Sequence, residues 1–349
     1  MVRLGIVGTG NWAHTHVKAY KTIRGVKVAA CCDILKTKAQ AFASRYEINS
    51  VYTDWRRMFD EAGLDAISVV TNDSTHAEIT VAAAKKGLHV LCEKPLATNV
   101  PDAQWMVRSA KKHRIINMIN LAHRCSALQK ARQLVQAGDA GDIIHLEAAY
   151  LQSWLSSNVF GDWRKNKTWI WRLSTQSGSN GVLADLGCHI LDFATYVAGD
   201  ISKLYCKLAT FDKGIGCDCY KGYKLDANDS AIITTLFKNG ALGTIHASRW
   251  ATGHRNTLYL SLYGTKGGLR IYIDAGDGYD KLMVSVKNDI HRARWKTLSC
   301  GSQKDNYHRF IESIKTGVND TPTFKEGARI QKYLEKCELS DKLKRQVNV

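Results

Sequence analysis

At 349 residues the chain is longer than a usual single domain, so we expect two domains that each bury a core. Hydrophobic residues make up 45% of it and charged residues 23%, which excludes an intrinsically disordered chain. The net charge of +17 comes from scattered lysines and arginines without a nucleic-acid-binding motif, so we expect no nucleic-acid partner.

The apolar runs are too short for a membrane span, which needs about 18 residues or more. A strand-like run begins at Val2 and leaves no room for a leader, so we expect a soluble protein with no membrane partner. Four cysteines lie in apolar segments and predict reduced thiols in the cytoplasm: Cys31, Cys32, Cys92 and Cys188. The pair Cys217 and Cys219 lacks a second pair at zinc-site spacing, so we expect no metal.

In the first third of the chain, short apolar runs alternate with helical patterns. The helical patterns cover residues 36–46 and 77–86. The strand candidates are residues 4–7, 26–32, 66–70, 90–92 and 115–119. This alternation predicts βαβ units and a parallel sheet, hence an α/β fold with an N-terminal domain of the Rossmann type over residues 1–122.

The pattern changes after Leu121, where a helical segment at 127–137 ends before Gly138. Further strand candidates follow at 143–152, 204–210, 230–237, 243–248, 258–263 and 268–273. Hairpin-like turns between them predict a C-terminal α+β domain over residues 123–349 with a large, mostly antiparallel open sheet. We expect a last helix at about 324–343 to pack back on the N-terminal domain.

The first chemical motif follows the first strand, where residues 8–13 read GTGNWA. Gly8 permits a tight turn, Gly10 lets the backbone approach a pyrophosphate, and the helix N-terminus faces the phosphates. Asp33 ends the second strand, where a carboxylate binds the ribose hydroxyls and favours NAD over NADP. Lys36 and Lys38 leave NADP open as the less favoured cofactor, and a helix N-cap is the other interpretation of Asp33.

Two further motifs carry groups suited to alcohol oxidation. Glu93-Lys94-Pro95 lies at the carboxyl edge of the predicted sheet, where Lys94 can bond a substrate hydroxyl; the alternative is a solvated lysine. Residues 185–192 read DLGCHILD and place Asp185 and His189 four apart on a helical pattern. A carboxylate beside an imidazole suits a general base, whereas the alternative is a capping aspartate and a core histidine.

Together, the GTG turn, the segment CEKPLA at 92–97 and the segment DLGCHILD resemble the Gfo/Idh/MocA oxidoreductases, named for glucose-fructose oxidoreductase and inositol dehydrogenase. The resemblance runs essentially end to end and implies Lys94, Asp185 and His189 as a catalytic trio. Besides Gly8 and Gly10, it implies cofactor contacts from Asn11, Trp12, Asp33, Thr71, His76, Glu93, Lys94 and Asn120. One departure is Thr71-Asn72-Asp73, where many members have Thr-Pro-Asn.

Two aromatic segments, YLQSW at 150–154 and WIWR at 169–172, resemble parts of sugar- and cyclitol-active members, levoglucosan dehydrogenase-like proteins among them. Aromatic faces stack on sugar rings and polar groups bond hydroxyls. The expected substrate contacts are Lys94, Gln152, Trp154, Arg172, Asp185 and His189. The alternative is that the tryptophans belong to the core or to a subunit interface.

The favoured function is therefore an NAD-dependent dehydrogenase that acts on a CH–OH group of a sugar, glycoside or cyclitol. Two alternatives remain: glycoside cleavage through transient oxidation, and a non-catalytic dinucleotide sensor. The resemblance also implies that the domain over residues 123–349 binds the substrate and joins the subunits of a homodimer or homotetramer.

Overall fold

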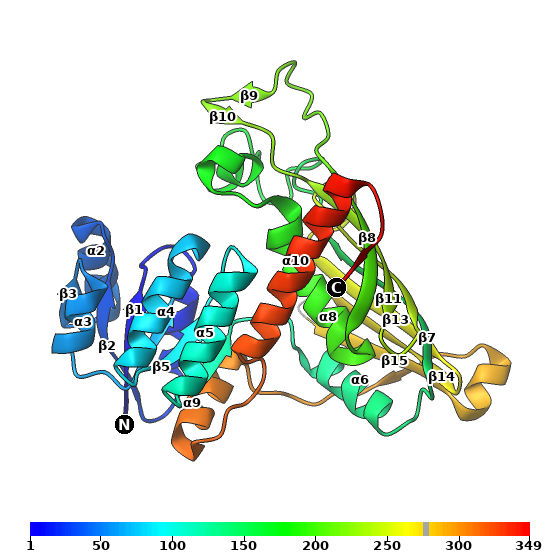
Figure 1. Ribbon diagram of the computed structural model, residues 1–349, viewed down its shortest axis with the longest axis horizontal. Helices are drawn as coiled ribbons and strands as arrows, with labels where there is room; N and C mark the ends of the chain where they lie inside the picture. The colour runs from blue at the N-terminus through cyan, green and yellow to red at the C-terminus, as the bar shows by residue number, and fades with distance from the viewer. Residues whose placement is uncertain (275–278) are drawn as a thin grey trace. The chain divides into compact units, whose positions relative to one another are not determined.

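The computed structural model describes residues 1–274 and 279–349, which form two compact units (Figure 1). The first unit contains residues 1–122 and 304–332, and the second contains residues 123–303 and 333–349. The last long helix, α10 (Phe324–Leu343), contributes residues to both units.

The first unit is built on a six-stranded parallel sheet with the order β3-β2-β1-β4-β5-β6. Its strands are β1 (Val2–Val7), β2 (Val26–Cys32), β3 (Ser50–Tyr52), β4 (Ala66–Val69), β5 (His89–Cys92) and β6 (Asn117–Ile119). The order reverses between β1 and β4, the place where open α/β sheets bind ligands. The predicted Rossmann sheet is confirmed.

Helices connect these strands as βαβ units require. They are α1 (Ala13–Lys21), α2 (Lys36–Tyr46), α3 (Trp55–Glu61), α4 (His76–Lys85) and α5 (Val100–Lys112), with a 3₁₀ turn at Asp73–Thr75. Side chains cap two of the helix N-termini: Asp54 accepts from the amide of Arg56, and Asn99 from that of Asp102.

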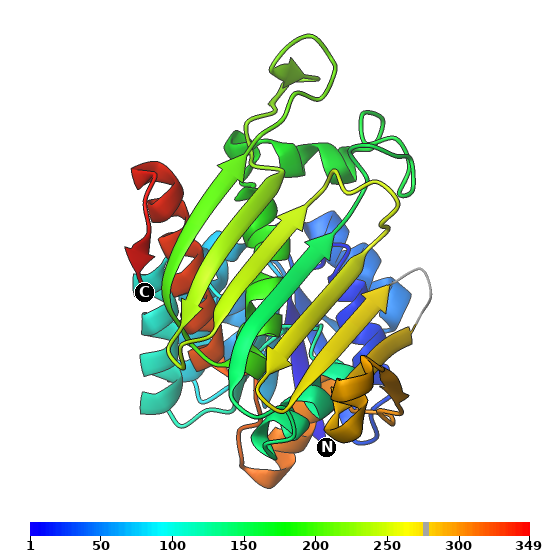
Figure 2. The ribbon, with the colours of Figure 1, turned by 90° about the vertical axis from the view of Figure 1, so that its right-hand side faces the viewer.

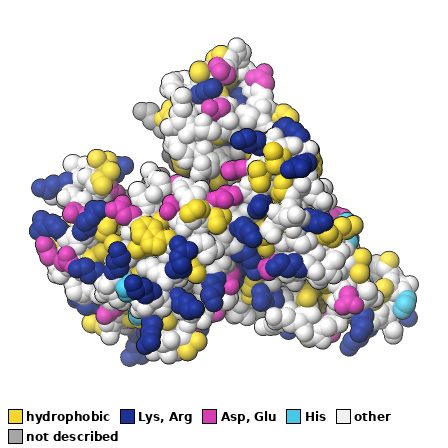
Figure 3. Space-filling model, in the orientation of Figure 1, with side chains coloured by type: hydrophobic (Ala, Val, Ile, Leu, Met, Phe, Trp, Pro, Cys, Tyr) yellow, Lys and Arg dark blue, Asp and Glu magenta, His cyan; other side chains and the backbone are white. Residues whose placement is uncertain are grey.

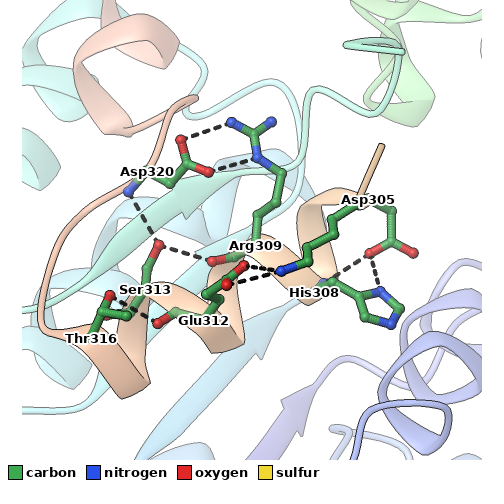
Figure 4. Close-up of polar contacts among 8 residues, drawn as sticks. Asp305, His308, Arg309, Glu312, Ser313, Thr316 and Asp320 are labelled. Carbon is green, nitrogen blue, oxygen red and sulfur yellow. Dashed lines mark hydrogen bonds and ion pairs between the residues drawn. The ribbon is translucent and has the colours of Figure 1, made fainter. Parts of the chain in front are cut away.

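Residues 304–332 complete the first unit through α9 (Asn306–Thr316) and the start of α10. Asp305 caps α9 by accepting from the amide of His308 at 2.8 Å, and Arg309 holds Asp320 through two hydrogen bonds of 2.7 and 2.8 Å (Figure 4). On the buried side, Phe310 packs in the same core cluster as Leu4.

The second unit is built on a nine-stranded sheet with the order β16-β15-β14-β13-β7-β12-β11-β8-β17. Neighbouring strands are antiparallel apart from β7 and β12, which are parallel, so the predicted mostly antiparallel sheet is confirmed. The strands are β7 (Ile143–Leu151), β8 (Ile201–Ala209), β11 (Ser230–Phe237), β12 (Leu242–Ser248), β13 (Thr257–Gly264), β14 (Gly267–Asp274), β15 (Tyr279–Val286), β16 (Lys296–Leu298) and β17 (Val347–Asn348).

Helices α6 (Ser126–Gln136) and α8 (Cys188–Ala198) pack on one face of this sheet. Buried and exposed residues alternate along β11 and β12, as expected when one face of a sheet is covered. Figure 2 looks onto the other face, where none of the described helices crosses the central strands. Shorter segments are α7 (Lys167–Ile170), β9 (Cys219–Tyr220), β10 (Tyr223–Lys224), a π-helical turn at Leu183–Gly187 and 3₁₀ turns at Trp171–Leu173, Thr175–Ser177 and Lys287–Arg292.

The surface charges do not gather into one patch on the face that Figure 3 presents, where lysines and arginines are interspersed with acidic side chains. Within the described part of the chain, no helix has the length and apolar character needed to cross a membrane.

Candidate active site

The glycine turn after β1 has the geometry that a dinucleotide requires. Gly8 has a φ of +91°, and a Cβ there would lie 2.5 Å from the carbonyl oxygen of Val70, so a side chain is excluded. A Cβ on Gly10 would meet open space, and Gly10 and Asn11 are exposed at the start of α1. Open backbone at a helix N-terminus fits a pyrophosphate. A hollow of about 480 Å³ opens here, lined by Thr9, Gly10, Asn11, His14, Lys38, Ala41, Phe42 and Arg45.

Asp33 ties the end of β2 to the glycine turn. Its Oδ2 accepts hydrogen bonds from the amide and the hydroxyl of Thr9 at 2.9 and 2.8 Å, and its Oδ1 accepts from the amide of Leu35 at 3.0 Å. Burial opposes ionisation of Asp33, but these hydrogen bonds outweigh it and lower its pKa. Asp33 is not the N-cap of α2, because Leu35 occupies that position.

Glu93 is a buried connection between β5, α1 and β6. Its Oε1 accepts from Trp12 Nε1 at 2.8 Å, from His16 Nε2 at 2.9 Å and from Asn120 Nδ2 at 2.6 Å. Burial favours the neutral form of Glu93, yet the hydrogen bond and charge of His16 and the Asn120 amide lower its pKa. The carboxylate of Glu93 therefore binds protein groups and fixes the backbone that leads into Lys94.

His76 joins two of the predicted cofactor segments. It is buried, and its ring nitrogens lie 3.2 Å from the carbonyl oxygen of Thr71 and 2.9 Å from that of Pro95. The departure from Thr-Pro-Asn leads into the 3₁₀ turn, in which Thr75 donates to the carbonyl of Asn72. Asn120 is also buried, bonding Tyr307 and Asn306 besides Glu93.

In the second unit, His189 lies in the first turn of α8 among other rings. Its side chain is buried, the His123 ring centroid is 4.6 Å away at 79°, and the Tyr150 ring centroid is 6.0 Å away. The hydroxyl of Tyr150 lies 3.4 Å from His123 Nε2. The fold thus gathers two imidazoles and a phenol. The sequence assigned no role to His123 or Tyr150, although Tyr150 begins the aromatic segment YLQSW.

Asp185 lies in the π-helical turn just before α8, a feature that is frequent at functional sites. Its Oδ2 accepts from Arg249 Nη2 at 3.1 Å, and Arg172 Nε is 3.8 Å away. Sequence patterns gave no signal for Arg249, because 64 residues separate it from Asp185. Asp192, the last residue of the same motif, forms a buried bidentate pair with Arg124 at 2.7 and 2.9 Å.

The aromatic segments divide into buried and exposed residues. Trp154 is 1% exposed and packs in a core cluster, with its Nε1 donating to Gln152 Oε1 at 3.0 Å, which fits the alternative of a core tryptophan. Trp171 is 37% exposed. The guanidinium of Arg172 lies 5.0 Å from the Trp169 ring and 4.8 Å from the Trp171 ring, distances typical of cation–π contacts.

Comparison with known proteins agrees with these features. Residues 2–121 match the oxidoreductase family with an NAD-binding Rossmann fold, and residues 128–270 match the GFO/IDH/MocA C-terminal domain. The chain is 25% identical to the levoglucosan dehydrogenase of Pseudarthrobacter phenanthrenivorans over 94% of this chain and 93% of that protein. It is 23% identical to the myo-inositol 2-dehydrogenase of Thermotoga maritima over 98% of this chain and 97% of that protein. A solved structure of levoglucosan dehydrogenase with NADH shares the fold, with a TM-score of 0.86, 22% identity and coverage of 100% and 99% of the two chains.

The glycine turn at the switch point of a parallel sheet and the family matches define an NAD-dependent oxidoreductase. The chain belongs to the Gfo/Idh/MocA family. The resemblance inferred from the sequence, the predicted enzyme class and the NAD cofactor are confirmed.

Proposed function

We propose that this protein transfers a hydride between NAD and a secondary alcohol on the ring of a sugar, glycoside or cyclitol. The observation that carries the proposal is the arrangement in the second unit, where buried His189 follows Asp185 and Asp185 faces two arginines. The names of the relatives support the substrate class, since levoglucosan is a sugar derivative and myo-inositol is a cyclitol.

In this proposal, Lys94, Asp185 and His189 are the catalytic trio. His189 takes the hydroxyl proton in oxidation and returns it in reduction, because an imidazole titrates near neutral pH. Asp185 supports the charge that develops on His189, and Lys94 donates a hydrogen bond to the reacting oxygen. Bound NAD supplies the hydride acceptor.

The polar residues of the first unit take two roles. The first role is to line the cofactor-binding site, and it falls to Gly8, Gly10, Asn11, Trp12, Asp33 and Thr71. Asp33 favours NAD over NADP. We assign a supporting role to Glu93, His76 and Asn120, because their side chains are buried and bond protein groups. Their hydrogen bonds hold the segments around Thr71 and Lys94 in position for the cofactor.

The substrate contacts in the second unit follow from exposure. Arg172 is half-buried and aromatic rings flank it, so its guanidinium can bond ring hydroxyls while Trp171 offers a face for stacking. Gln152 and Trp154 are buried and hydrogen-bonded to each other, so in this proposal they support the substrate-contacting residues from below. The second unit is thus the substrate-binding domain.

We further propose that a second copy of this chain covers the open sheet face in a homodimer or homotetramer. Three large apolar side chains on its strands are more than half exposed: Ile144, Ile232 and Leu242. Apolar residues on an uncovered sheet favour association. A cytoplasmic location is proposed from the ten free thiols, most of them buried as packing groups.

The proposal is tested by following absorbance at 340 nm with the purified protein, NAD and a panel of inositols, hexoses, 1,6-anhydrosugars and glycosides. Formation of NADH with one ring class is the expected result. Release of the aglycone from a glycoside without net NADH would favour the closed redox cycle. Dinucleotide binding with no reaction across the panel would favour a sensor and overturn the proposal.

A further inference from the structure

The carboxylate of Asp185 has an unusual environment, because the charged groups that approach it come from distant parts of the second unit. Arg249, which directly follows β12, donates from Nη2 to Asp185 Oδ2 at 3.1 Å. Arg172 approaches the same oxygen at 3.8 Å from the 3₁₀ turn at Trp171–Leu173. The side chain of Asp185 is 31% exposed, so one part of the carboxylate faces the protein and another faces outward.

Arg249 is held much more tightly than Asp185. Its side chain is fully buried, and its Nη1 donates to the carbonyl oxygen of Arg172 at 3.0 Å. Its guanidinium lies 5.2 Å from the Trp154 ring, and its backbone amide donates to the carbonyl of Asp229 at 3.0 Å. Burial lowers the pKa of Arg249, and the neighbouring Asp185 carboxylate opposes that shift. A buried guanidinium needs such a partner, because an unpaired charge in the interior is costly.

A second carboxylate near Arg249 has its own cation. Asp229 is buried and its Oδ2 accepts from Lys213 Nζ at 2.7 Å, with both side chains at most 2% exposed. The charge of Asp229 is therefore balanced by Lys213, which leaves the charge of Arg249 to act on Asp185.

We propose that Arg249 is a positioning residue that keeps Asp185 ionised and aimed toward His189. The inference rests on the proposed function, in which Asp185 supports the charge of His189. Because its side chain is fully buried, Arg249 acts through Asp185 and not on the substrate. Arg172 is less buried, with 26% of its side chain exposed.

The test compares Arg249→Met, which keeps the length of the side chain and removes its charge, with Arg249→Lys, which keeps a charge. Arg270→Met is the matched control. The guanidinium of Arg270 on β14 also lies over a tryptophan, 4.0 Å from the Trp295 ring, but among the described residues it has no carboxylate partner. The full chain is labelled with ¹³C at aspartate carboxyl carbons, and Asp185→Asn identifies the Asp185 signal.

In the methionine variant, the midpoint of the Asp185 titration is expected to rise by about one pH unit or more, because a nearby opposite charge favours the ionised carboxylate. The lysine variant is expected to lie between wild type and the methionine variant, and the Arg270→Met control is expected to match wild type. With an active substrate, kcat is expected to fall in the methionine variant, while KM for NAD stays within about twofold.

An unmoved Asp185 titration in Arg249→Met would overturn the inference. If that variant does not fold, Arg249→Lys decides the question, and a wild-type midpoint together with wild-type kcat would overturn it. The titration needs no substrate, so absence of turnover across the ring-alcohol panel would overturn the proposed function alone. Turnover with an unmoved titration would overturn the role of Arg249 alone.

Discussion

Two carboxylates, one in each unit, are surrounded by the protein in opposite ways. The side chain of Glu93 in the first unit is 10% exposed, and its Oε1 accepts from Trp12, His16 and Asn120. Asp185 in the second unit is 31% exposed at its side chain and faces the guanidinium groups of Arg172 and Arg249. Both belong to motifs that the resemblance marked as functional.

Under the proposed function, the difference separates a structural carboxylate, Glu93, from one that takes part in the reaction, Asp185. A carboxylate saturated by buried donors stabilises the fold and the backbone beside it. In the proposal, Asp185 is a partly exposed carboxylate whose ionised form is favoured by the arginines beside it, and it supports the charge of His189. The comparison predicts that variants near Glu93 change stability and cofactor binding, and that variants near Asp185 change turnover.

The largest effect is expected from His189→Ala. Loss of a general base lowers kcat by about 10²- to 10⁴-fold, while the affinity for NAD stays within a few-fold. Turnover at 340 nm and NADH fluorescence titration measure the two quantities. The control is His145→Ala on β7, whose ring lies next to Tyr263. Unchanged turnover in His189→Ala would remove His189 from the mechanism.

Glu93→Gln is expected to destabilise the protein by about 3 kcal/mol, because it removes the charge of a buried carboxylate that accepts from Trp12, His16 and Asn120. Urea unfolding measures the loss, with exposed Glu78→Gln as the control. The pKa of Glu93 is lowered in the folded state, so its stabilisation is present above the unfolded value of about 4.3 and is lost as pH falls through the folded value. The difference between wild type and Glu93→Gln should therefore shrink in acid. A difference that is equal at pH 7 and pH 3 would contradict a role for the charge.

Gly10→Ala is expected to leave folding intact, because its Cβ would enter open space. It is expected to weaken NAD binding by about tenfold, because the added methyl group would stand where the pyrophosphate approaches the backbone. Gly8→Ala serves as the contrast, since its Cβ would clash with the carbonyl of Val70 and should lower the melting temperature. Calorimetric NAD titration and thermal unfolding distinguish them. Wild-type affinity in Gly10→Ala would place the phosphates elsewhere.

The smallest effect is expected from Asp33→Ala. If the carboxylate binds the ribose, this change should lower the affinity for NAD by several-fold and the affinity for NADP by less. Because Asp33 also bonds Thr9, a stability loss accompanies the change. Dissociation constants for NADH and NADPH measure the selectivity. An equal loss of affinity for both cofactors would mean that Asp33 does not select the cofactor and acts only through its hydrogen bonds to Thr9 and Leu35.

Local patterns predicted the elements whose hydrophobic period is clear. The strand at 26–32, the helix at 36–46 and the strand at 230–237 have the predicted bounds. The spacing of Asp185 and His189 was interpreted with α-helical geometry, but Asp185 lies in a π-helical turn that hydrogen-bonds five residues along. One extra residue in a helical turn leaves no mark on the hydrophobic period of the sequence.

Contacts between distant segments lie outside any local pattern. Arg249 meets Asp185 across 64 residues, and the amide of Phe324 donates to Asn117 across 207. The short strands β16 and β17 are likewise stabilised by pairing with β15 and β8 and not by their own sequences. Motif residues were thus identifiable from the sequence, whereas the partners that hold them depend on the fold.

The central claim is that the ring carbon of the substrate gives its hydrogen to NAD. The most direct test uses the active ring alcohol deuterated at the reacting carbon and follows the label by mass spectrometry of the dinucleotide and the product. The account predicts deuterium in the reduced dinucleotide and a slower turnover than with the protium substrate. Deuterium that stays at, or returns to, the same carbon of the product without accumulating in NADH would contradict it.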